Sequence, residues 1–116
     1  METEMETRKV DIPILLRQTY DDDPRIRWQA LIHLCPCHVK RNQEQVWNRA
    51  VALAADADPK VRDTVLHILT DGSPRSREPE VVRILEQMHH DPEPKVRRKA
   101  RKILAHYRRT GAWNIS

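Results

Sequence analysis

The chain contains only 2 glycines and no phenylalanine among its 116 residues. Tight turns between strands favour glycine, so this shortage argues against a sheet-rich fold. Long apolar runs are also missing: no stretch approaches the roughly 20 apolar residues of a membrane span, and METEMETRKV at the start lacks the apolar segment of a signal peptide. We expect one domain, a cytoplasmic location with reduced thiols, and no association with a membrane.

Residues 95–109, KVRRKARKILAHYRR, contain eight Lys or Arg and no acidic residue. The whole chain has 21 basic and 17 acidic residues, for a net charge of +4. Without these eight, 13 basic residues stand against 17 acidic ones, a net charge of −4. The basic character therefore lies in one C-terminal helix, and any argument for a polyanionic partner depends mainly on it.

Proline, by contrast, is abundant for a helical protein, with 8 residues. Three of them, Pro24, Pro59 and Pro94, are 35 residues apart and lie in similar segments, DDDPRIRWQALIHL, DADPKVRDTVLHIL and DPEPKVRRKARKIL. A recurrence with one fixed period over several kinds of position predicts an internal repeat.

Each copy is predicted to be a helix with proline in its first turn and acidic residues before it, where the helix dipole favours them. Positions 26, 30, 33 and 34 of the first copy share one face and are expected in the core. A second helix is predicted ahead of each proline, roughly over 13–20, 43–55 and 79–89. One such hairpin cannot bury its own apolar face, so the copies are expected to stack.

The pattern D-x-D/E-P-x-[IV]-R-x-x-[AV]-x-x-x-L resembles the HEAT-repeat family over residues 11–109. The resemblance implies an all-α fold, an α-solenoid of three HEAT-like hairpins. The expected repeats are 10–42, 43–77 and 78–109, with a disordered or frayed N-terminus at 1–9. In the tail, 110–116, Trp113 and Ile115 are expected to pack on the last repeat.

A stacked polar ladder is a further implication of the resemblance. In that family an aspartate and the arginine six residues later form such a ladder along the array. A carboxylate at this place can pair with an arginine of its own repeat or of the adjacent one. By resemblance the ladder residues are Asp21 with Arg27, Asp56 with Arg62, and Asp91 with Arg97.

The stretch HLCPCHV looks like a metal site at first sight. A zinc site usually needs four ligands at spacings such as Cys-x-x-Cys, and Cys-x-Cys ligands are strained on one tetrahedral ion. The repeat places Cys35–His38 in an inter-repeat loop whose copy, TDGSPRSR, has no Cys or His. His33 aligns with the core positions Ile68 and Ile103. We therefore expect a structural corner, with no metal and no cofactor.

The second helix of each hairpin forms the concave face in HEAT-like arrays, so its outward residues are the candidate binding residues: Arg25, Trp28, Lys60, His67, Lys95, Arg98, Lys99 and Lys102. Gln29, Ile32, Asp63 and Thr64 are expected on the same face. Two interpretations of the basic helix stay open, an anion-binding surface and the solvated outer face of a terminal helix. Trp28 is either a binding anchor or a residue buried by the N-terminal helix.

The sequence contains no nucleophile–base–acid grouping and no glycine-rich phosphate loop, so we expect no enzyme. His89 and His90 end a helix, where a cationic histidine suits the dipole. The expected function is a non-catalytic scaffold that binds a protein on the concave face. The alternative is sequence-independent nucleic-acid binding through the basic helix and the inter-repeat loops. A third possibility is an enzyme accessory role, since the resemblance extends to HEAT-like repeats of bilin lyases and of DNA glycosylases. The oligomeric state is left open.

Overall fold

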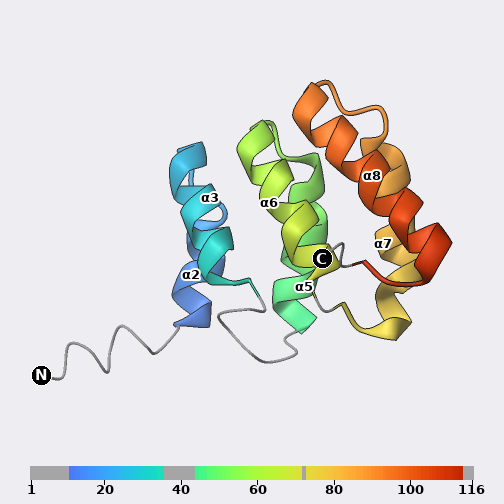
Figure 1. Cartoon of the computed structure of the whole chain (residues 1–116). Coiled ribbons are helices and arrows are strands. Elements are labelled where there is room, and N and C mark those ends of the chain that lie inside the picture. Colours follow the sequence, from blue (N-terminus) through green and yellow to red (C-terminus); the bar gives the residue numbers. More distant parts are fainter. Residues whose placement is uncertain (1–10, 36–43, 72, 114–116) are drawn as a thin grey trace, which may run out of the picture.

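The computed structural model describes residues 11–35, 44–71 and 73–113. These residues contain no strand and form three helical hairpins in a row (Figure 1). The α-helices are α2 (Ile12–Gln18), α3 (Pro24–His33), α5 (Glu44–Ala52), α6 (Pro59–Thr70), α7 (Glu78–Met88) and α8 (Pro94–Thr110). Two short 3-10 helices, η1 (Leu53–Ala55) and η2 (Arg75–Arg77), adjoin α5 and α7. Among the described residues, no helix is long and apolar enough to cross a membrane.

The prolines of the repeat begin α3, α6 and α8, as the sequence predicts. Proline suits this place because its fixed φ is helical and its missing N–H would have no partner there. Asp23 and Asp58 precede two of these prolines, and each carboxylate accepts a hydrogen bond from a backbone N–H of the first turn. Gly111 ends α8 with a φ of 78°, in the left-handed region that favours glycine.

The hairpins stack so that α3, α6 and α8 form one layer and α2, α5 and α7 the other (Figure 1). Equivalent residues of the three repeats fill the space between the layers. The closing leucines are 1% exposed or less, and the small apolar position is equally buried: Leu34, Leu69 and Leu104, with Ala30, Val65 and Ala100. The equivalent positions are therefore buried in all three copies, and those of the second and third belong to one hydrophobic cluster.

Arginines of the repeat link successive hairpins. Arg27 donates two hydrogen bonds of 2.9 Å to the carboxylate of Asp56. Arg62 donates bonds of 2.8 and 2.9 Å to Asp91 in the same way. Each arginine also donates to the backbone carbonyl of the aspartate six residues before it: Arg27 to Asp21, Arg62 to Asp56 and Arg97 to Asp91. The carboxylates of Asp56 and Asp91 therefore pair with the arginine of the preceding repeat, and not with the arginine of their own repeat.

Two residues of the first repeat expected in the core are exposed instead. Ile26 is 36% exposed, whereas its equivalents Val61 and Val96 are buried. His33 is exposed as well, although it aligns with the buried residues Ile68 and Ile103. Their neighbours on the same predicted face, Ala30 and Leu34, are buried, so only part of that face is covered. The partner helix of α3 in this hairpin, α2, has only seven residues.

Trp113 lies on the last repeat, 8% exposed, with its ring stacked on Tyr107 at a centroid distance of 3.8 Å. Its Nε1–H donates to Ser73 Oγ in the connection between α6 and α7, at 2.9 Å. The segment therefore contacts residues of two neighbouring repeats. Ile115, the predicted N-terminal segment 1–9 and residues 36–43 lie outside the described residues.

Candidate binding groove

Two adjoining hollows lie on the face formed by α3, α6 and α8. The first has a volume of about 380 Å³ and is lined by Trp28 of α3, Lys60 of α6, and Glu93 and Lys95 at the start of α8. The second has a volume of about 340 Å³. Its lining residues are Trp28, Ile32, Cys35, Asp63, Thr64, His67 and Lys99. Trp28 and Asp63 line both, so we call the two hollows together the groove.

Trp28 is half-buried, with part of its side chain packed against the core. The ammonium group of Lys60 lies 5.5 Å from the centroid of its ring, which is close enough for a cation–π contact. An aromatic surface held by the core and open to a hollow can contact an apolar side chain of a ligand at low entropic cost.

The lysines around the groove differ in whether they form an ion pair within the chain. Lys60 and Lys95 are exposed in the first hollow, whereas Lys99 in the second forms an ion pair of 3.0 Å with Asp63. Glu93 is the other acidic residue lining the first hollow. The rim thus offers ammonium groups that a carboxylate can reach.

The remaining candidate binding residues lie outside the two hollows. Arg98 and Lys102 are exposed on α8, and within the part of the chain that the structure describes neither forms an ion pair. Arg25 is exposed and pairs with Asp23 at 3.0 Å. The hydrogen bond from Arg25 holds the pKa of the Asp23 carboxyl below its ordinary value. Thr64, which was expected to point outward, is buried, and its hydroxyl donates to the carbonyl of Lys60.

The histidine at the end of α7 differs from the sequence-based interpretation. His89 is the C-cap residue of α7 and is half-buried. Burial lowers the pKa of its imidazole, and the nearby charges of Arg101 and Arg108 lower it further. A neutral imidazole is therefore favoured, in contrast to the cationic interpretation of His89. The same arginine, Arg101, donates to the carbonyl of His89 at 2.8 Å and links α8 to the end of α7.

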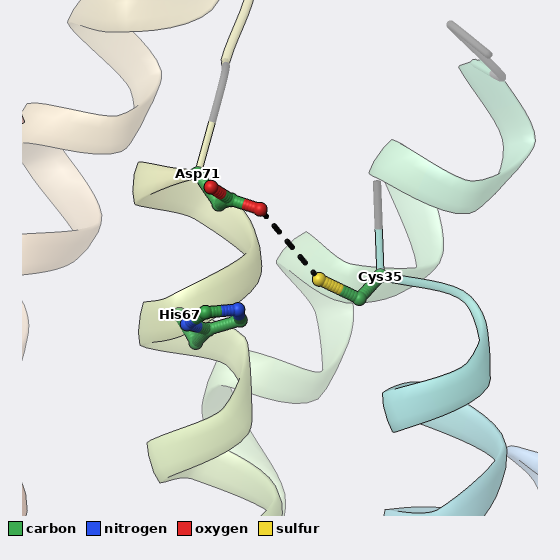
Figure 2. Close-up of side chains that lie close together, drawn as sticks. All are labelled: Cys35, His67 and Asp71. Carbon is green, nitrogen blue, oxygen red and sulfur yellow. Dashed lines mark hydrogen bonds between the residues drawn. The ribbon is translucent and has the colours of Figure 1, made fainter. Parts of the chain in front are cut away.

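Cys35 has two neighbours that the sequence analysis did not weigh. Its side chain is 2% exposed, and its Sγ lies 3.9 Å from Asp71 Oδ2 of the second repeat. His67 lies one turn before Asp71 on α6 (Figure 2). The sequence contains a signal for this grouping. The 35-residue period makes residue 70 the equivalent of Cys35 in the next repeat, and equivalent residues of stacked repeats lie side by side. Cys37 and His38 of the predicted corner lie outside the described residues.

A family model described as HEAT repeats matches residues 12–105, most of the chain. No curated protein and no solved structure matches the chain.

Proposed function

Because the chain belongs to the HEAT-repeat family, we propose that it binds a partner protein in the groove between α3, α6 and α8. HEAT repeats generally act as scaffolds for protein interactions and are typically non-catalytic. The observation that supports this choice of surface is the position of Trp28 between two hollows, with exposed lysines beside it. The partner is expected to present an acidic segment with at least one apolar side chain.

The groove suits such a segment for two reasons. An apolar side chain can pack on the ring of Trp28, and binding energy in interfaces is concentrated in aromatic anchors of this kind. Carboxylates on either side of that apolar residue would then lie near the exposed ammonium groups of Lys60 and Lys95. Exposed charges of this type mainly raise the association rate and set the specificity.

The test compares partner recovery by three variants of the full chain. Wild type and variants are immobilised and incubated with a nuclease-treated lysate, and the bound proteins are identified. The affinity of wild type and of each variant for the purified partner is then measured. Lys60→Glu with Lys95→Glu reverses two exposed charges of the first hollow. Trp28→Ala removes the ring. Arg83→Ala is the control, because Arg83 is exposed on α7 in the other layer.

We expect Arg83→Ala to bind the partner as wild type does, and the two groove variants to lose at least tenfold in affinity, about 1.4 kcal/mol. Trp28→Ala also removes contacts with the core, so its melting temperature is measured in parallel. The charge-reversal variant does not touch the core and separates a binding defect from a folding defect. A partner that both groove variants retain at wild-type affinity would show that binding occurs on another surface.

A further inference from the structure

Cys35, His67 and Asp71 form a compact cluster of three different metal-ligand types. Cys35 follows the end of α3, whereas His67 and Asp71 lie one turn apart at the end of α6. One ligand atom from each residue lies within 4.8 Å of the other two. In Figure 2 the side chains of His67 and Asp71 both extend from α6 toward the sulfur of Cys35.

We propose that these three residues bind a zinc ion. Zinc bonds of about 2.0–2.3 Å in a tetrahedron place the ligand atoms about 3.3–3.8 Å apart. The sulfur of Cys35 and the nearer oxygen of Asp71 are already 3.9 Å apart. His67 is exposed, so its imidazole can rotate over the short distance that remains without disturbing the core.

The chemistry of the three ligands selects zinc over hard cations. Calcium and magnesium require several oxygen ligands, and this cluster supplies a carboxylate as its one oxygen donor. A thiolate, an imidazole and a carboxylate are all ordinary zinc ligands. The negative charges of thiolate and carboxylate balance the charge of the ion. The thiol of Cys35 must release its proton to water for this, so zinc affinity is expected to fall as the pH falls.

Three protein ligands leave one tetrahedral position for water or for a group of a bound molecule. Cys35 and His67 both line the second hollow of the groove, so that position is expected to face the hollow. The ion would also connect the first two repeats at the C-terminal ends of α3 and α6. The bond between Arg27 and Asp56 connects the same repeats near the N-terminal end of α3. The site does not depend on the proposed protein partner, and it departs from the sequence-based expectation of a purely structural corner.

The experiment uses the full chain, freed of metal under reducing conditions and titrated with Co²⁺ and then with Zn²⁺. We expect one ion per chain, an absorption band from thiolate-to-cobalt charge transfer, and displacement of cobalt by zinc. Zinc at a hundredfold excess over Kd is expected to raise the melting temperature by about 10 °C, because it binds the folded chain.

His67→Ala is the decisive variant, because His67 is exposed and its loss leaves the core intact. We expect it to reduce zinc affinity at least tenfold, and Asp71→Asn to do the same. His90→Ala, at an exposed histidine near the end of α7, and Cys37→Ser are the controls and are expected to bind as wild type does. Equal zinc affinity of wild type and His67→Ala would overturn the proposal, and so would a cobalt band that depends on Cys37 rather than on Cys35.

Discussion

The two junctions between repeats use the same ion pair in different surroundings. At the first junction Arg27 binds Asp56, and the two side chains are 16% and 6% exposed. At the second junction Arg62 binds Asp91, and the exposed fractions are 10% and 5%. Each junction also has further connections. At the first, Arg49 of α5 donates two hydrogen bonds of 2.9 Å to Thr19 and lies 3.5 Å from the ring centroid of Tyr20. At the second, Lys99 forms an ion pair with Asp63, and Trp113 donates a hydrogen bond to Ser73.

The groove extends over both junctions. Both hollows begin at the half-buried ring of Trp28 at the first junction, and both reach residues of α8 at the second. The cluster of Cys35, His67 and Asp71 spans the first junction. The repeated ladder thus holds both junctions together, and its ion pair is more deeply buried at the second. We infer that the ladder contributes more to stability at the second junction, whereas Trp28 and the cluster give the first junction the larger share of the ligand-facing side chains.

Arg62→Ala gives the largest expected effect. The substitution leaves Asp91, which is 7% exposed, without both hydrogen bonds from the guanidinium. Removing one partner of a buried ion pair costs roughly 3–5 kcal/mol, because the other charge stays buried. Denaturant unfolding of wild type and variant measures this difference. The matched control is Arg75→Ala, at an exposed arginine of η2, where about 0.5 kcal/mol or less is expected. Equal stabilities of the two variants would refute the ladder.

Arg27→Ala is expected to cost less, about 2–3 kcal/mol, because the guanidinium of Arg27 is more exposed than that of Arg62. This variant also tests a pH dependence. Burial raises the pKa of Asp56, but the hydrogen bonds from Arg27 and from the backbone of Asp58 outweigh it, so the folded pKa lies below 3.8. A carboxyl whose pKa is lower in the folded chain contributes stability above its unfolded pKa. That contribution is lost as the pH falls through the folded pKa.

The melting temperatures of wild type and Arg27→Ala should therefore differ at neutral pH, and the difference should shrink below pH 3.8. Thermal melts by circular dichroism over an acid series measure this. If the difference in melting temperature stays constant to the lowest pH, Arg27 does not stabilise the fold through the carboxylate of Asp56.

The sequence predicted the helices well because their signals are local. Proline at the first turn and the 3.6-residue apolar pattern place α3, α6 and α8 without knowledge of their neighbours. Ile26 and His33 were mispredicted because an alignment of repeats assigns the same environment to equivalent positions. Burial depends on the neighbouring elements that cover a position, and the repeat pattern itself contains no information about them.

The groove was only partly predictable. Helical spacing identified Trp28, Lys60, Lys95 and Lys99 as residues of one face, and the structure brings them to the two hollows. Whether a hollow forms depends on the volumes of side chains from three helices, and spacing along one helix does not give that. The proximity of Cys35 to Asp71 joins residues 36 positions apart, and the search for zinc ligands within one loop missed it.

Arg98→Gln with Lys102→Gln gives the smallest expected effect on stability. Both residues are exposed on α8, and in the described part of the chain neither forms an ion pair, so their loss leaves no partner unpaired. Removing two positive charges from a helix crowded with them also relieves repulsion. We expect a melting temperature within about 2 °C of wild type, since surface changes cost about 0.5 kcal/mol or less.

The same double variant tests nucleic-acid binding, which would involve the exposed face of α8 rather than the groove. If α8 binds a duplex, each lost phosphate contact lowers the slope of log affinity against log salt by about 0.9. The two substitutions would then lower it by about 1.8. We expect instead that wild type binds no DNA or RNA even at low salt, because Lys99 and Arg101 already have partners within the chain. Wild-type binding with a slope steeper than that of the variant would move the functional surface from the groove to the exposed face of α8.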